Sequence, residues 1–382
     1  MANSSGDKTA VILSGGGADG AYEVGVVNAL FQGESPATGH QPLNPDIITG
    51  TSVGAYNAAV LVSHLENQAS AAAAYLENIW VNVIPREDHS GHSHVFRLRG
   101  NPFDLLSPAY VAARPLEPPV KLVEDTAFFS QDWFRRAANF FRSPGDLQKR
   151  ALELVDMSTL FSREPLDRLV RATVQFESIR RSQKQLRVAA TNWKTAEVRI
   201  FQNGDMTDGT GPKAIVASTA IPGVFDSVEI EGDPYVDGGV VMNTPLKPAI
   251  EALADTVHII YLDPEVRALP LLQVQNTLDT MYRMLVVGWA AAVNEDCHTL
   301  QRVNKSIEAL SKLPAAAEVI DHPDFKAMHR KITVHRYHPH GDLSGLLGLL
   351  NFERNRMIDL VNRGFHDAKQ HDCVTSECIL HN

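Results

Sequence analysis

The chain has 382 residues, with 35 Lys and Arg against 45 Asp and Glu, so its formal net charge is −10. This acidic balance excludes the large basic surface by which proteins bind nucleic acid, and we expect no nucleic-acid partner. Hydrophobic residues make up 44% of the chain, which is enough for a substantial core. The longest uncharged apolar run, residues 284–293, is too short to cross a bilayer.

The N-terminal sequence has no basic leader ahead of a long apolar run, so we expect no signal peptide and a cytoplasmic protein. The three cysteines, Cys297, Cys373 and Cys378, form no disulfide framework and do not have the spacing of metal ligands. The sequence therefore predicts free thiols in a reducing compartment and no bound metal.

The first elements in chain order repeat one pattern. Residues 9–30 predict a strand, a glycine-rich turn and an apolar helix, and residues 46–65 predict the same three elements again. Strands that alternate with helices in this way are typical of α/β proteins. We expect a mainly parallel central sheet flanked by helices.

The remaining elements follow an interruption. Residues 85–160 are rich in Pro, Arg and aromatic residues and predict a surface insertion. Beyond it we expect a helix from 165, strands over 185–202, a helix over 211–225, a hairpin over 227–239 and a strand from 256. After residue 266 the pattern is mostly helical, with one strand over 331–337. The sequence thus predicts an α/β domain over 8–265 and a helical C-terminal extension, 266–382, packed on it.

The first glycine motif, "GGGADG", runs from Gly15 to Gly20 between a strand and a helix. Its backbone N–H groups and the helix N-terminus favour an anion. A dinucleotide site would need an acidic residue at the end of the next strand, where "TGTSVG" stands, and a Walker loop would need Gly-Lys-Ser/Thr. An oxyanion hole is the third interpretation.

The second motif, Gly50 to Gly54, places Ser52 between two glycines after a predicted strand. It fits a nucleophile elbow, in which a strained turn projects the serine. The alternative is an ordinary strand-to-helix turn capped by Thr51 or Ser52. Only one helix and one strand separate Gly17 from Ser52, which argues against the α/β-hydrolase layout.

The third motif is Asp237-Gly238-Gly239. An isolated Asp-Gly favours a hairpin turn, but "EGDP" just upstream already supplies one. Asp237 would then end a strand with its carboxylate directed at the elbow. A carboxylate hydrogen-bonded to Ser52 could accept the serine proton once burial has raised its basicity.

Together the three motifs resemble the patatin-like phospholipase family, as do residues 165–170, 188–201 and 217–246, so that the resemblance covers about 8–265. It implies that Ser52 is the nucleophile and that Asp237 is the base, which activates the serine and later a water. It also implies hydrolysis of carboxylic esters of phospholipids or lysophospholipids without a cofactor. The implied oxyanion hole consists of the N–H groups of Gly15, Gly16, Gly17, Ala18 and Val53, with Gly20, Gly50, Gly54, Gly238 and Gly239 as supporting glycines and Ser218 and Pro222 as the wall of the site.

One position departs from the family pattern. The family usually has Arg or Lys where this chain has Asp19. We expect Asp19 to face away from the oxyanion and to cap the helix that starts near Ala21. An acyltransferase of the same fold, and a catalytically weak scaffold that binds a lipid or a partner, stay open as alternatives.

Four further features have two interpretations each. Residues 128–141 would form an aromatic, arginine-flanked helix that either contacts a membrane peripherally or packs on the domain. Residues 343–352 either line an acyl channel or form a plain buried helix. A metal could bind His89, His92 and His94, but we favour a solvated loop for these three. An Asp/His triad could use His335, His338 or His340, but we favour surface strand positions for them. The sequence leaves a homo-oligomer open.

Overall fold

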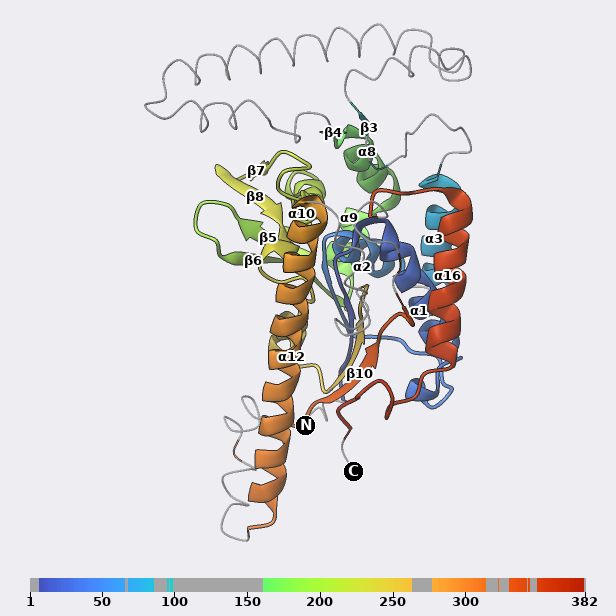
Figure 1. Ribbon diagram of the computed structural model, residues 1–382, viewed down its shortest axis with the longest axis vertical. Helices are drawn as coiled ribbons and strands as arrows, with labels where there is room; N and C mark the ends of the chain where they lie inside the picture. Colours follow the sequence, from blue (N-terminus) through green and yellow to red (C-terminus); the bar gives the residue numbers. More distant parts are fainter. Residues whose placement is uncertain are drawn as a thin grey trace, which may run out of the picture.

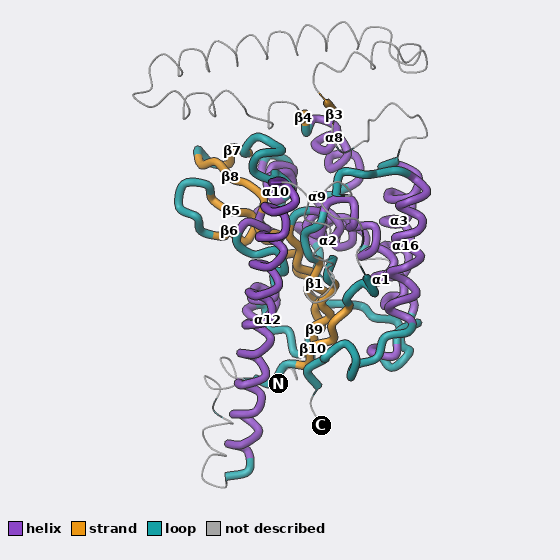
Figure 2. Tube along the Cα trace, in the orientation of Figure 1, coloured by secondary structure: helices purple, strands orange, loops and turns teal. Residues whose placement is uncertain are grey.

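A computed structural model describes residues 7–65, 68–85, 95, 97–98, 161–262, 277–313, 322, 330–341, 343 and 349–380. A central sheet with the strand order β10-β9-β1-β2-β5-β8-β7 runs through this part, and β6 also pairs with β5. Helices cover both faces of the sheet (Figures 1 and 2). The predicted α/β fold is confirmed, whereas almost all of the predicted insertion lies outside the described residues.

Five strands form the parallel part of the sheet. Alternate residues of β1 face opposite cores, since Val11 and Leu13 contact one apolar cluster and Ala10 and Ile12 the other. A strand buried on both faces must be apolar throughout, which explains its sequence "TAVIL". The five strands are β1 (Thr9–Leu13), β2 (Ile47–Thr51), β5 (Gln185–Asn192), β9 (Thr256–Ile260) and β10 (Thr333–Tyr337).

The other end of the sheet is antiparallel. It contains β6 (Val198–Gln202), β7 (Val228–Ile230) and β8 (Asp233–Asp237). The predicted hairpin is confirmed as β7 and β8, with positive φ at Glu231 and Gly232 in its turn. Two short strands, β3 (Arg97–Leu98) and β4 (Phe161–Ser162), pair separately.

The helices divide between the two faces. One face carries α1 (Gly20–Gln32), α2 (Val53–His64), α3 (Ala69–Asn78), α8 (Glu164–Thr173), α9 (Phe176–Arg181), α10 (Thr210–Ser218) and α16 (Arg354–Lys369). The other carries α11 (Leu246–Glu251) and the long α12 (Thr277–Ser311), which projects beyond the sheet (Figure 1). Among the described residues, no helix is both long and apolar enough to span a membrane.

Two glycines let α16 lie directly against α1. A Cβ added to Gly25 would fall 1.9 Å from the carbonyl oxygen of Val361, and one added to Gly364 would fall 2.0 Å from that of Tyr22. Backbones can approach this closely only where side chains are missing. The Tyr22 hydroxyl also donates to Asp367 at 2.9 Å.

The C-terminal region contributes a strand to the sheet as well as helices. The predicted strand over 331–337 is confirmed as β10, which pairs in parallel with β9 and forms one edge of the sheet. Ile379 in turn pairs with Val334 of β10 through two backbone hydrogen bonds of 2.8 and 2.9 Å. The domain boundary at 265 stays a prediction.

Candidate active site

Strand β5 brings Ser52 and Asp237 together. Strand β2 runs parallel to β5 and ends with Thr51 opposite Ala189, whereas β8 runs antiparallel to β5 and ends with Asp237 opposite Ala190. The carboxyl ends of β2 and β8 therefore meet at consecutive residues of one strand. Ser52 follows the first end and Asp237 is the second, so two residues distant in sequence face one crevice.

The turn at Ser52 has the strained backbone of a nucleophile elbow. Ser52 has φ 56° and ψ −127°, which is unusual for a residue with a side chain. An added Cβ at Gly50 would lie 2.2 Å from the Gly54 carbonyl oxygen, so a side chain there is sterically excluded. Ser218 holds the turn, since its hydroxyl accepts from the Ser52 N–H at 2.9 Å and donates to the Ala189 carbonyl at 2.6 Å.

The glycine loop lies directly over this turn. A Cβ on Gly15 would approach the Ser52 Cβ to 3.0 Å, and one on Gly20 would meet Val53 at 2.5 Å. Val53 is the first residue of α2, so its N–H has no partner within the helix and lies at the positive end of the helix dipole. Gly17 takes the left-handed conformation with φ 56°.

Two of the predicted oxyanion donors are already engaged. The Gly15 N–H donates to the Asn243 carbonyl at 3.1 Å, and the Ala18 N–H donates to the Leu349 carbonyl at 2.8 Å. The N–H groups of Gly16 and Gly17 have no protein acceptor within the described residues. In this conformation the predicted hole is therefore limited to Gly16, Gly17 and Val53 as donors.

Burial makes Asp237 an unusually basic carboxylate. Desolvation raises its pKa to about 7, although the Ser52 hydroxyl and the Gly239 N–H both lower it. The Gly239 N–H donates to Oδ1 at 2.7 Å, while Oδ2 makes no hydrogen bond of normal length and angle within the described chain. Oδ2 is thus a buried acceptor without a proton donor, next to a hydroxyl that has a proton to give.

Asp19 is placed differently from the sequence prediction. It is the N-terminal cap residue of α1, but its side chain makes no capping hydrogen bond. Its buried carboxylate instead pairs with the guanidinium of Arg356 at the start of α16. The prediction of a cap was wrong because a cation from a distant helix competes better for a buried carboxylate than a backbone N–H does.

An apolar pocket opens at Ser52. It encloses about 560 Å³, including its opening to solvent, and aliphatic and aromatic side chains make up most of its wall. Ile221 contributes to this wall, whereas Pro222 does not. The lining residues are Gly17, Ser52, Val53, Tyr56, Trp80, Ile84, Val95, Leu166, Leu169, Thr219, Ile221, Phe225, Leu349, Leu350 and Phe352.

Within the described part of residues 343–352, three side chains line this pocket: Leu349, Leu350 and Phe352. These three residues of the stretch thus contribute to the pocket beside Ser52, as the channel interpretation requires. The Phe352 ring stacks on Trp80 with centroids 6.2 Å apart. Trp80 in turn donates to Asn57 of α2 at 2.8 Å, which links the wall to the helix that follows Ser52.

The segment after Asp237 contains residues that sequence reasoning missed. The Asn243 side chain donates to the Gly15 carbonyl at 3.1 Å, and Thr51 donates to the Met242 carbonyl at 2.8 Å. Trp289 of α12 donates its ring N–H to the Gly239 carbonyl. For Met242 and Asn243 the sequence signal was their place within the family-like residues 217–246, whereas no sequence signal marked Trp289.

The late histidines and cysteines also depart from prediction. His340 is exposed and pairs with Asp367 at 2.8 Å, but His335 is buried, so its prediction as a surface residue was wrong. Cys373 and Cys378 are free thiols as predicted, yet they lie beside two imidazoles, so the prediction that they lack ligand spacing was wrong as well. His89, His92, His94 and the helix predicted over 128–141 lie outside the described residues.

Comparisons with known proteins identify the family of this chain. The model of the family described as patatin-like phospholipase matches residues 11–250. Among solved structures, VipD from Legionella pneumophila is similar at 13% identity with a TM-score of 0.36, over 95% of this chain and 66% of that chain. No curated protein matches.

Proposed function

Because the chain belongs to the patatin-like phospholipase family, whose members are lipid acyl hydrolases, we propose that it cleaves carboxylic esters of phospholipids or lysophospholipids through a Ser52–Asp237 dyad. The observation that carries this proposal is the meeting of β2 and β8 on β5. It explains why an alcohol and a basic carboxylate share one crevice under a loop of backbone N–H groups.

The reaction follows from these positions. Asp237 accepts the proton of Ser52 while the serine oxygen attacks the acyl carbonyl carbon. The N–H groups of Gly16, Gly17 and Val53 stabilise the resulting oxyanion. When the C–O bond breaks, the proton passes from Asp237 to the leaving alcohol, and Asp237 then deprotonates the water that hydrolyses the acyl-enzyme.

The pocket supports an acyl chain as the group transferred to Ser52. Its wall is apolar from Trp80 to Phe225, as a site for a hydrocarbon chain requires. The acidic net charge supports lysophospholipids or dispersed esters as substrates, because the chain has no excess of basic residues for an anionic bilayer. In keeping with its free cysteines, we place this activity in the cytoplasm.

A fluorophosphonate probe tests the nucleophile. We expect it to label the wild-type protein and Ser218→Ala, whose serine holds the turn, but not Ser52→Ala. Mass spectrometry of products from a mixed lipid extract then identifies the ester. Labelling that persists in Ser52→Ala, or that never occurs in the wild type, would contradict the proposal.

One observation favours a second candidate, a lipid-binding scaffold with little turnover. The Gly15 N–H is occupied by the Asn243 carbonyl and the Ala18 N–H by the Leu349 carbonyl, so two donors of the predicted oxyanion hole are blocked in this conformation. A scaffold would bind lysophospholipid in the pocket, measurable by calorimetry, without releasing fatty acid. Fatty acid release that depends on Ser52 would exclude it.

A further inference from the structure

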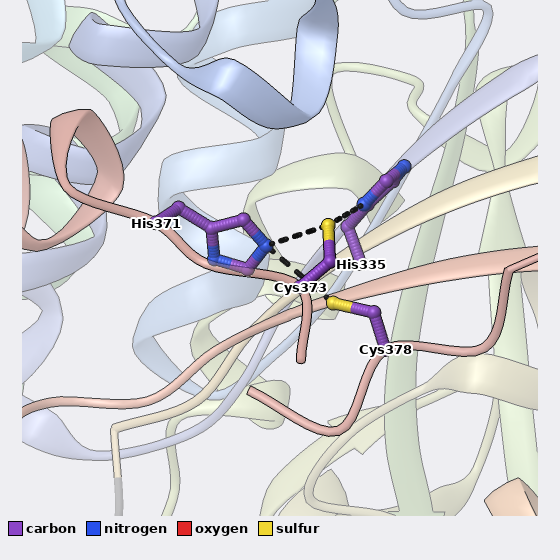
Figure 3. Close-up of side chains that lie close together, drawn as sticks. All are labelled: His335, His371, Cys373 and Cys378. Carbon is purple, nitrogen blue, oxygen red and sulfur yellow. Dashed lines mark hydrogen bonds between the residues drawn. The ribbon is translucent and has the colours of Figure 1, made fainter. Parts of the chain in front are cut away.

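Two histidines and two cysteines converge at the C-terminal end of the chain, and none of them lines the pocket at Ser52. His335 comes from β10, His371 follows the end of α16, and Cys373 and Cys378 lie in the turn after it. The four candidate ligand atoms all lie within 4.8 Å of one another. Figure 3 shows both sulfurs and both rings directed toward one point.

The distances match a tetrahedral metal site. The Cys373 Sγ lies 3.5 Å from the His335 Nδ1 and 3.5 Å from the His371 Nε2, and the Cys378 Sγ lies 3.4 Å from the same His371 atom. In a tetrahedral zinc site with ordinary Zn–S and Zn–N bonds, neighbouring sulfur and nitrogen ligands are about 3.6 Å apart. Three of the six distances between ligand atoms are thus already those of such a tetrahedron, and the other three are at most 4.8 Å.

The ligand set also selects the metal. Two thiolates and two imidazoles suit zinc, whereas calcium and magnesium need oxygen ligands. The stretch holds two carboxylates, and both have other partners. Asp372 is used by the turn itself, since its Oδ1 accepts from the N–H groups of Val374 and Thr375 at 2.9 and 2.7 Å. Glu377 pairs with the Arg336 guanidinium at 3.5 Å. Four residues separate the two cysteines, a spacing common in structural zinc sites.

We propose that His335, His371, Cys373 and Cys378 bind one Zn²⁺ in a closed, structural site that fastens the C-terminal segment to strand β10. Nothing in the Ser52–Asp237 chemistry requires this ion. All four ligand positions come from the protein, so no open position is left for a substrate or a water.

Neighbouring groups hold the ligands in place. The backbone N–H of Arg336 donates to the Cys378 Sγ at 3.4 Å, a hydrogen bond that stabilises a thiolate. Ser376 contacts the His371 Nδ1 at 3.4 Å, which leaves the Nε2 for the metal. The Cys378 N–H donates to the Cys373 carbonyl at 2.9 Å, so the turn closes with both sulfurs on one side. The pairing of Ile379 with Val334 fixes this turn beside His335.

The charges balance when the ion binds. The two thiols lose their protons to solvent, so that two thiolates neutralise one Zn²⁺ and the half-buried cluster carries no net charge.

Metal analysis of the full-length protein, purified under reducing conditions and dialysed, tests this proposal. We expect about one Zn²⁺ per chain in the wild type and less than about a tenth of that in Cys373→Ser and in His371→Gln. His366→Gln is the matched control, because His366 is an exposed histidine of α16 outside the cluster, and it should keep its zinc. Replacing zinc by Co²⁺ should give the visible absorption of a tetrahedral thiolate site.

A second measurement needs no variant. Bound zinc should protect Cys373 and Cys378 from alkylation in the wild type, and a chelator should expose both thiols and lower Tm, with ZnCl₂ restoring both properties. A protein that takes up no zinc under these conditions would overturn the proposal. So would a mass lowered by two hydrogens that maps to a Cys373–Cys378 disulfide, or zinc retained equally by all variants.

Discussion

The strand ends around Ser52 and the C-terminal region after residue 330 contribute to the same site in different ways. The first region holds its chemistry in short motifs, where adjacent residues act together. The second contacts residues that are distant in sequence: the Leu349 carbonyl binds the Ala18 N–H, and Arg356 pairs with Asp19. Arg356 also donates to the Asn351 carbonyl at 2.7 Å, so one side chain joins both regions. The family match ends at residue 250. The comparison shows that residues after this point help to fix the glycine loop.

The largest expected effect lies in the first region. Asp237→Asn and Ser52→Ala should each lower kcat by about 10³-fold or more, measured as fatty acid release. Ser218→Ala, which only loses a hydrogen bond behind the turn, should cost far less. If Asp237→Asn kept most of the wild-type rate, Asp237 would not be the base for Ser52.

The same Asp237→Asn variant should be more stable than the wild type. The folded state raises the pKa of Asp237 to about 7, above its unfolded value, so the folded protein holds a proton that the unfolded chain has lost between about pH 4 and 7. Stability therefore falls as pH rises through this window. The amide removes this loss, with a gain on the order of 2–4 kcal/mol at pH 8 and less at pH 5 in urea unfolding.

The next effect tests the second region. Arg356→Gln removes the guanidinium that pairs with the buried Asp19 carboxylate and should cost about 3–5 kcal/mol in urea unfolding. Asp19→Asn combined with Arg356→Gln should recover most of this loss, because neither charge remains. If Arg356→Gln were as stable as the wild type, the ion pair between α16 and the glycine loop would contribute nothing to the free energy of unfolding.

A smaller effect tests the packing of α16 on α1. Gly364→Ala places a methyl group against the Tyr22 carbonyl and should lower the free energy of unfolding by about 1–3 kcal/mol. Gly288→Ala is the control, since Gly288 lies within α12 and a Cβ there meets nothing within 4 Å. It should be neutral or slightly stabilising by helix propensity. Equal thermal unfolding of both variants would contradict the close approach of the helices.

The smallest effect is in the pH profile of the wild type. Because Asp237 must be ionised to accept a proton and its pKa is about 7, kcat/KM should rise about tenfold between pH 6 and 8 and then level off. A flat profile over this range would show that another group is the base.

The sequence predicted most of the first region because its constraints are local. Gly50 and Gly54 mark a turn that only glycine permits, and the alternation of strands and helices predicts the sheet. It could not predict Arg356 as the partner of Asp19, because no pattern links residues on two helices. His335 was assigned to the surface for a similar reason: a strand in the polar sequence "KITVHRY" does not show that residues 371–379 cover it.

The shared strand β5 has a consequence for the order of events during synthesis. Ser52 and its strand leave the ribosome long before β8 does, and until β8 pairs with β5 the serine lacks its proposed base. Under the proposed mechanism, Ser52 is therefore unreactive during most of synthesis, and hydrolysis begins only when a late, long-range pairing is complete. Recovery of esterase activity during refolding would accordingly lag behind recovery of helical structure.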